Sequence, residues 1–252
     1  MSRSHLEYQL LAESDSYGDG ALRYLDAATL ATLEPQSFQR TYPYPWLSIQ
    51  QLITPEGYQA LRHTLPPVQQ CRKSFGRWRL YGQTSHDRFV LEWRWKPKLS
   101  QPWQEFIEEL QGPIYGDLMR RMLGVTSLRL NFHWHYTPAG CSVSPHCDSP
   151  WKLGSHIFYF NDHDDWDPDW GGGTLILDDH QARSWRSAPS FDELDTVACA
   201  PSLGNTSLLF QRTPHSWHAV RPLRCPEGVF RRVFIVEIIR GGLAPKVRHY
   251  FG

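Results

Sequence analysis

The amino-acid sequence predicts a mainly β fold, a sandwich or barrel, with helices in its N-terminal half. Short segments rich in β-branched and aromatic residues recur after residue 126, separated by clusters of Gly, Pro, Asp and Asn. This is the pattern of many short strands joined by turns. The 19 prolines and the 11 Trp, 11 Tyr and 12 Phe also favour strands and turns over long helices. Helical spacing of apolar residues is found before residue 125, so helices are expected to pack on a C-terminal β core.

A first helix is predicted over residues 54–65, while residues 1 to about 45 show no clear periodicity. Thr54 is a suitable N-cap and Pro55 suits the first helical position. Tyr58, Leu61 and Leu65 recur at helical spacing and form an apolar stripe.

A second helical region is predicted over 101–123, after strands expected within 72–96. Gly112 and Pro113 break or kink this region, and Gly124 stands where a C-terminal cap belongs. Its two apolar stripes are Trp103, Phe106, Ile107 and Leu110, then Leu118, Met122 and Leu123.

Six strands are predicted after residue 126, and no linker or repeat divides the chain. We therefore expect one domain over 1–252, with supporting helices and strands in 1–125, the β core in 126–240 and a tail in 241–252. The six strand segments are "SLRLNFHWHYT", "SHIFYFN", "GTLILDD", "TSLLFQ", "SWHAVRPL" and "RRVFIVEIIR".

The charge balance and the cysteines narrow the class of protein. Lys and Arg together number 26, as do Asp and Glu. The chain therefore has no overall positive charge, which argues against a protein that binds nucleic acid through phosphate contacts. The stretch "RKSFGRWRLYG" (72–82) is locally basic and is interpreted as a hairpin whose Arg stems cover aromatic rings. Five cysteines without a CxxC pair, no signal peptide and no apolar run of membrane length predict a cytoplasmic protein without a membrane span.

The segment "SVSPHCDSPWK" contains the most informative pair of side chains. On a strand, His146 and Asp148 would share one face, whereas Cys147 would point away. Two His and one carboxylate form a facial triad that leaves coordination sites open on iron. The third ligand is expected from "TPHSWHAVRPL", which offers both His215 and His218.

An ordered series of motifs between about residues 128 and 238 resembles the 2-oxoglutarate- and Fe(II)-dependent dioxygenases, especially their prolyl-4-hydroxylase-like branch. The motifs are "YTPAG" (136–140), "PHCD" (145–148), "FYFN" (158–161), "WGGGTLIL" (170–177), "APSLGNTSLLF" (200–210), "HAVRPL" (218–223) and "RRVFIVEI" (231–238). The resemblance implies a double-stranded β-helix core of the jelly-roll, cupin-like kind. It makes His218 the distal metal ligand beside His146 and Asp148.

The resemblance also implies a site for 2-oxoglutarate. Its C5 carboxylate needs a buried cation, and Arg suits it best. Arg231 and Arg232 point to opposite faces of their strand, and both faces are apolar. The family's spacing favours Arg232. Tyr159 is then expected to bind the C5 carboxylate, and Tyr136 to lie near 2-oxoglutarate or the substrate.

These features predict an oxygenase that uses Fe(II), 2-oxoglutarate and O₂, with ascorbate as a supporting reductant. The reaction that the resemblance implies is hydroxylation of an unactivated C–H bond, coupled to decarboxylation of 2-oxoglutarate to succinate and CO₂. Asp148 favours hydroxylation, because related halogenases carry a small residue at this ligand position. The expected substrate is a prolyl or other amino-acid side chain in a peptide, a free amino acid or a small metabolite. Lys152 is a candidate partner for an acidic substrate group.

Two other classes of protein fit the His-Asp-His pattern. One is a cupin-like β-barrel that binds a metal or small molecule without oxygenase activity. The other is a zinc hydrolase, because the same three ligands and a water suit zinc.

Overall fold

The computed structural model describes residues 22–77 and 79–241, and antiparallel β-sheets form its centre. Most of the predicted tail, the first 21 residues and Trp78 lie outside the described residues. The helices are α1 (Ala27–Ala31), α2 (Pro35–Gln39), α3 (Pro55–His63), α4 (Gln101–Gln111) and α5 (Pro113–Leu123). Among these residues, no helix is long and apolar enough to cross a bilayer.

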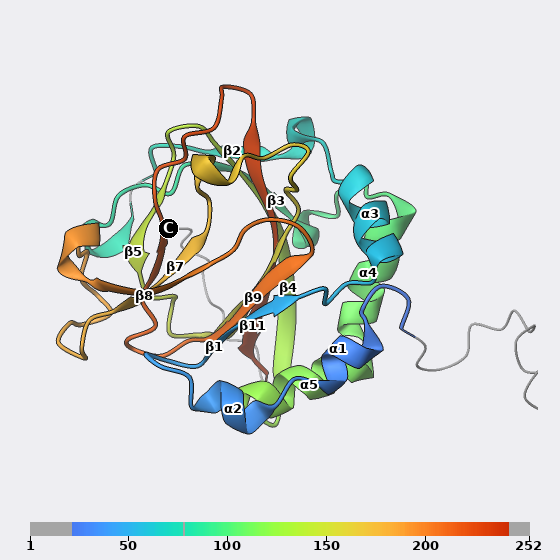
Figure 1. The fold of residues 1–252 in the computed structure, drawn as a ribbon, viewed down its shortest axis with the longest axis horizontal. Helices are drawn as coiled ribbons and strands as arrows, with labels where there is room; N and C mark the ends of the chain where they lie inside the picture. The colour runs from blue at the N-terminus through green and yellow to red at the C-terminus, as the bar shows by residue number, and fades with distance from the viewer. Residues whose placement is uncertain (1–21, 78, 242–252) are drawn as a thin grey trace, which may run out of the picture.

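The strands form a seven-stranded and a four-stranded sheet that face one another, and this is the jelly-roll arrangement (Figure 1). The larger sheet has the order β1-β9-β6-β11-β4-β3-β2, and the smaller has the order β5-β10-β7-β8. The strands are β1 (Trp46–Gln50), β2 (Arg72–Ser74), β3 (Arg88–Glu92), β4 (Leu128–Pro138), β5 (Val143–His146), β6 (Lys152–Tyr159), β7 (Thr174–Asp178), β8 (Asp195–Ala200), β9 (Thr206–Gln211), β10 (His218–Val220) and β11 (Phe230–Arg240).

The predicted helices are confirmed, together with the signals that begin and end them. The Thr54 side chain accepts a hydrogen bond from the Gly57 amide at the start of α3. Gly112 separates α4 from α5, and Gly124 ends α5 with a φ of 64°, a left-handed conformation that suits glycine.

All six strands predicted after residue 126 are present, but the sequence did not predict β1 or β8. The structure also shortens the strand expected at the His-x-Asp segment, because β5 ends at His146 and Asp148 lies beyond it. Both unpredicted strands lie at sheet edges. β8 is largely exposed, so it carries no alternating pattern of burial.

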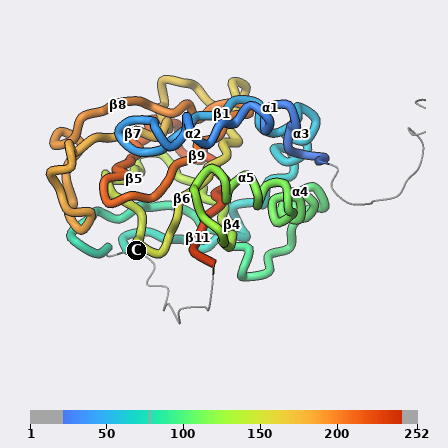
Figure 2. The backbone as a smooth tube through the Cα atoms, turned by 90° about the horizontal axis from the view of Figure 1, so that it is seen from below, coloured from blue at the N-terminus to red at the C-terminus, as the bar shows by residue number. Residues whose placement is uncertain are grey.

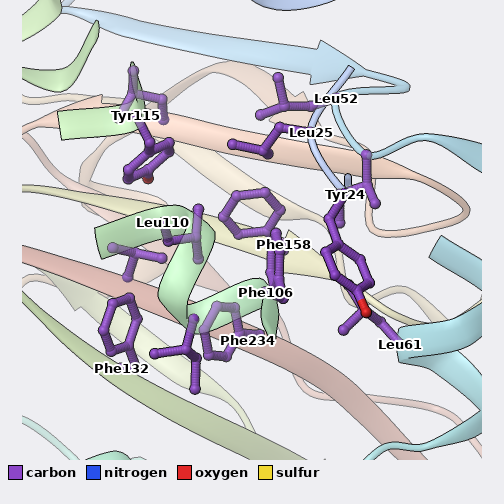
Figure 3. Close-up of a cluster of buried hydrophobic side chains, with 14 of the residues drawn as sticks. Tyr24, Leu25, Leu52, Leu61, Phe106, Leu110, Tyr115, Phe132, Phe158 and Phe234 are labelled. Atoms are coloured by element: carbon purple, nitrogen blue, oxygen red, sulfur yellow. The ribbon is translucent and has the colours of Figure 1, made fainter. Parts of the chain in front are cut away.

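The helices cover the outer face of the larger sheet and form the main hydrophobic core with it (Figure 2). Trp103 of α4 has no exposed surface, and its ring lies 5.2 Å from Trp134 of β4 and 5.0 Å from Phe234 of β11. Figure 3 shows Phe106 and Leu110 of α4 packed beside Phe132, Phe158 and Phe234 of the sheet.

A second, smaller core fills the space between the two sheets. It contains Ile157 of β6, Ile176 of β7 and Val233 of β11. Adjacent residues of β6 and β11 therefore contribute to different cores, since side chains alternate across a strand. This alternation decides which polar residues of the two strands can reach the candidate site.

His156 gives the helix-side core a pH-dependent stability. It has no exposed surface, and its ring nitrogens lie 2.9 Å from the Tyr115 hydroxyl and 3.0 Å from the Ser207 hydroxyl. Burial lowers the pKa of His156 from 6.5 to about 3. Below pH 6.5, His156 therefore binds a proton in the unfolded chain but stays neutral in the folded chain. The free energy of unfolding falls as the pH drops from 6.5 towards 3.

We predict that His156→Gln weakens this pH dependence. Since one pKa unit corresponds to about 1.4 kcal/mol, the wild-type loss between pH 7 and pH 5 should exceed that of the variant by about 2 kcal/mol. Urea unfolding at both pH values measures this difference. The exposed His163 supplies the control His163→Gln, which should behave as wild type. Equal pH dependence in His156→Gln and the wild type would refute the assignment.

Candidate metal centre

Three side chains from the smaller sheet and the adjoining loop converge on one point. His218 begins β10 and is paired in register with His146, the last residue of β5. Asp148 follows two residues later. One donor atom from each of the three residues lies within 4.8 Å of the other two. The structure thus brings together the three residues that the sequence predicts as metal ligands.

Backbone carbonyls orient the two imidazole rings of this cluster. The Nδ1 atom of His146 lies 2.9 Å from the Ser144 carbonyl, and that of His218 lies 3.0 Å from the Ser216 carbonyl. Nδ1 therefore carries the proton, and Nε2 is left as the metal-binding atom. Burial lowers the pKa of both histidines. The neutral form that binds a metal is therefore the resting form.

Asp148 is held as a carboxylate by the groups around it. Burial by itself would raise its pKa, but the Lys152 ammonium and the two histidines outweigh burial and hold the pKa below its usual range. Lys152 lies 3.0 Å from one carboxylate oxygen, and Ser155 donates to the other at 2.9 Å. Lys152 also forms an ion pair with Glu237 at 3.1 Å. Both partners of Lys152 are therefore within the chain, which is against its expected role in binding a substrate acid.

This donor set fits ferrous iron. Two neutral imidazoles and one carboxylate, arranged on one side of a point, are the facial triad of non-heme iron sites. His215 does not join them, because its Nδ1 lies 2.9 Å from the buried carboxylate of Asp179. Of the two late histidines, the structure places only His218 in the cluster.

Arg231, the second residue of β11, lies in a second polar group between the sheets. The Arg231 side chain donates from Nε to the Gly172 carbonyl at 2.5 Å and from Nη2 to the Thr174 hydroxyl at 3.2 Å. The Tyr159 hydroxyl also lies 2.9 Å from that of Thr174. Arg231 is 5% exposed, and no Asp or Glu among the described residues pairs with it. Burial lowers its pKa.

Gly172 allows this close contact. Its φ of 96° suits glycine, and an added Cβ would lie 3.3 Å from the Arg231 Cδ atom. The glycine-rich stretch "WGGGTLIL" therefore wraps around the arginine, and its Thr174 provides a polar contact.

The structure places Arg232, the arginine that the family's spacing favours, away from the space between the sheets. Arg232 lies on the opposite, helix-covered face of β11, where it forms an ion pair with Asp165, and its amide donates to the Asn161 side chain. Alternation alone could not decide between them, because residues on both faces are apolar. The face of β11 on which each arginine lies became known only because Phe234 packs against the helices and Val233 packs between the sheets.

The same alternation corrects the position expected for Tyr136. It faces the helices, is 3% exposed, and its hydroxyl donates to the Pro66 carbonyl at 2.6 Å. Its neighbours His133 and His135 lie on the other face of β4, towards the space between the sheets.

His86 is a residue near the cluster that the sequence did not reveal. It is 6% exposed, its ring lies 4.7 Å from that of His146, and its Nε2 lies 2.9 Å from the Ser144 hydroxyl. It belongs to the loop before β3 and to no motif, so only the tertiary structure identifies it.

Comparisons with known proteins agree with this geometry. Residues 132–240 match the model of the 2OG-Fe(II) oxygenase superfamily, whereas no curated protein sequence matches. Among solved structures, a prolyl-4-hydroxylase from Pseudomonas putida has a TM-score of 0.51 at 14% identity, over 78% of this chain and 92% of that one.

Two further solved structures share the fold. The α-ketoglutarate-dependent carbocyclase SnoK from nogalamycin biosynthesis has a TM-score of 0.58 at 12% identity, over 84% of this chain and 85% of its own. A Trichoplax adhaerens prolyl hydroxylase, in complex with a hypoxia inducible factor peptide fragment, has a TM-score of 0.51 at 16% identity, over 77% of this chain and 83% of that one.

The geometry predicts that His146→Ala, Asp148→Ala and His218→Ala each weaken Fe(II) or Mn(II) binding by roughly ten-fold or more. Metal content after dialysis, measured by elemental analysis, tests this directly. His180, which is exposed, supplies the control His180→Ala with unchanged metal content. Near-wild-type metal content in His218→Ala would instead favour His215 as the third ligand.

Proposed function

We propose that this chain, whose residues 132–240 match the model of the 2OG-Fe(II) oxygenase superfamily, hydroxylates an unactivated C–H bond and converts 2-oxoglutarate to succinate and CO₂. The observation that carries the proposal is the pairing of two sites. The metal cluster of His146, Asp148 and His218 lies in the same inter-sheet space as Arg231, a buried cation with no carboxylate partner among the described residues.

The three ligands would hold ferrous iron and leave positions open to exogenous ligands. When bound there, the iron supplies the redox chemistry that uses O₂ and 2-oxoglutarate. The protein contributes orientation around it: two carbonyls direct the histidine rings, and Ser155 and Lys152 fix the carboxylate of Asp148. The carboxylate at this ligand position favours hydroxylation over halogenation.

Arg231 is proposed to bind the C5 carboxylate of 2-oxoglutarate. A buried guanidinium without a counter-charge is costly, and an anionic ligand offsets this cost. Tyr159 and Thr174 lie beside it and supply hydroxyl groups for the same carboxylate. On β6, Tyr159 and Ser155 share a face and are separated by about 13 Å along the backbone, estimated from ~3.3 Å per residue. Ser155 lies at the metal end of this interval and Tyr159 at the Arg231 end. A 2-oxoglutarate molecule bound to both the metal and Arg231 would lie along it.

Apolar side chains are proposed to keep water away from the co-substrate. Ile157 and Val233 lie on the strands that carry Tyr159 and Arg231, and Leu208 and Phe210 of β9 complete a buried apolar wall. Water exclusion strengthens the Arg–carboxylate contact. It also suppresses side reactions at the metal.

The substrate is proposed to be an amino-acid side chain in a peptide, a free amino acid or a small metabolite. A cupin-like binding protein or a zinc hydrolase would use the His-Asp-His cluster as well. Neither requires the uncompensated Arg231 beside Tyr159 and Thr174. The oxygenase accounts for both groups of residues, and for this reason we favour it.

Oxygen uptake and succinate formation test the activity itself. With Fe(II) and ascorbate, the wild type should convert 2-oxoglutarate to succinate with matching O₂ consumption, and His146→Ala should not. Zinc-loaded protein should also be inactive. If the wild type formed no succinate across a screen of amino acids, peptides and metabolites, the proposal would fail.

The two adjacent arginines give a matched test of the co-substrate site. Arg231→Gln should raise the KM for 2-oxoglutarate by roughly 10- to 100-fold, because a hydrogen-bonded charge is worth about 1.5–3 kcal/mol. Arg232→Gln should change it less than about three-fold, because Arg232 faces the helices. Steady-state succinate formation measures both values, and the reverse order would return the anchor to Arg232.

A further inference from the structure

Two arginines lie next to one another in the fold: Arg79 is in the loop between β2 and β3, and β3 begins at Arg88. His86, which packs against the His146 ring, accepts a hydrogen bond through its carbonyl from the Arg88 Nη1 atom at 2.7 Å. The Arg88 guanidinium is therefore one contact removed from a metal ligand. Arg79 belongs to the same loop, two residues before Tyr81, whose ring packs edge-on against that of Trp185.

Neither arginine is neutralised by the part of the chain that the structure describes. Arg79 donates from Nε and Nη2 to the neutral Gln83 side chain, both at 3.2 Å. Within residues 22–77 and 79–241, the buried Nε atom of Arg88 has no hydrogen-bond partner. No carboxylate of these same residues lies within ion-pair distance of either guanidinium. Burial, with a smaller contribution from the charge of Arg79, lowers the pKa of Arg88 to about 10.

The nearest acidic groups already have partners. Asp148, which acts on Arg79 from a distance, is held by Lys152 and Ser155. Of the two acids that act on Arg88, Asp87 accepts from the Gly76 amide and Glu92 pairs with Arg94. The positive charges of Arg79 and Arg88 are therefore available to a ligand, as is the charge of Arg231.

The pair of Arg79 and Arg88 is distinct from Arg231, the proposed anchor of the co-substrate. Arg88 lies on β3 and Arg231 on β11, with β4 between them. Their backbones are thus about 10 Å apart, estimated from ~4.8 Å between neighbouring strands. The side chains also turn to different partners, since Arg88 contacts His86 beside β5 and Arg231 contacts Thr174 of β7.

Aromatic side chains connect the β2–β3 loop with the segment after β7. Tyr81 of the same loop packs edge-on against Trp185 at 5.5 Å. The guanidinium of Arg212 lies 5.3 Å from the Trp185 ring, and its Nε donates to the Asp148 carbonyl. The β2–β3 loop therefore meets the segment after β7 beside the metal ligands, where a substrate would have aromatic and cationic neighbours.

We propose that Arg79 and Arg88 bind an oxyanion of the substrate, a carboxylate or a phosphate, beside the metal. This rests on the proposed function and narrows its substrate class to acids. Lys152 does not take this role, because it is held between Asp148 and Glu237. A bidentate guanidinium matches either oxyanion and also fixes its orientation.

The test uses the Mn(II)-loaded protein with saturating 2-oxoglutarate, so that the co-substrate site is already filled. Calorimetric titrations compare benzoate, phenyl phosphate and the neutral benzamide as probes. At least one anion should bind about 100-fold more tightly than benzamide, the change expected for two hydrogen-bonded charges of about ten-fold each. The tighter of the two anions distinguishes carboxylate from phosphate recognition. Equal binding of all three by the wild type would overturn the proposal.

Variants assign the effect to the two residues. Arg88→Gln and Arg79→Gln should each reduce the preference for the anion by about ten-fold, and Arg88→Lys should retain part of it. Arg40→Gln, at an exposed position following α2, serves as the matched loss of charge and should keep the preference. If Arg88→Gln does not fold, Arg79→Gln and the comparison of the three probes on the wild type still test the proposed oxyanion site. Full preference in a folded Arg88→Gln would contradict the assignment.

Failure of this proposal can be separated from failure of the proposed function. Succinate formation by the wild type is measured without any probe, so its absence concerns the oxygenase alone. Succinate formation together with equal probe binding would reject only the oxyanion site. If Arg88→Gln raised the KM for 2-oxoglutarate as much as Arg231→Gln does, Arg88 would belong to the co-substrate site and the proposal would be wrong.

Discussion

The two-sided burial of β11 is the constraint on which the remaining structure depends. This strand lies between β6 and β4 in the larger sheet, with helices on one face and the smaller sheet on the other. Phe234 therefore packs with α4, while Val233 faces β7 across the space between the sheets. A shift of one residue would exchange the two faces and bury Arg232 in the place of Arg231.

The polar residues of the site follow from this register. Across β6 and β11, Ser155 is opposite Glu237, and Tyr159 is opposite Val233. The metal-side contacts of Asp148 thus lie at one end of these strands, and the Arg231 group lies at the other. The helices on the outer face supply no ligand, but they keep the sheet in the register that separates the two ends.

The charges of the site fall into two kinds. Lys152 is placed between Asp148 and Glu237, so its charge is satisfied within the chain. Arg231, Arg79 and Arg88 have only neutral hydrogen-bond partners among the described residues. Since a buried charge without a partner is costly, the first kind stabilises the metal-binding geometry, and the second is suited to anions that arrive from outside.

The sequence by itself determined the class of fold, the three residues of the candidate metal cluster and the chain order of six core strands. These features depend on local patterns: helix caps, short apolar strands, and motifs in a fixed order. Only the tertiary structure placed Arg231 between the sheets and Arg232 on the helix side, moved Tyr136 to the helix side, showed that Lys152 is already paired and revealed His86. Each of these depends on which face of a strand meets the helices, or on contacts between distant segments. When both faces of a strand are apolar, alternation tells which residues share a face but not where that face points.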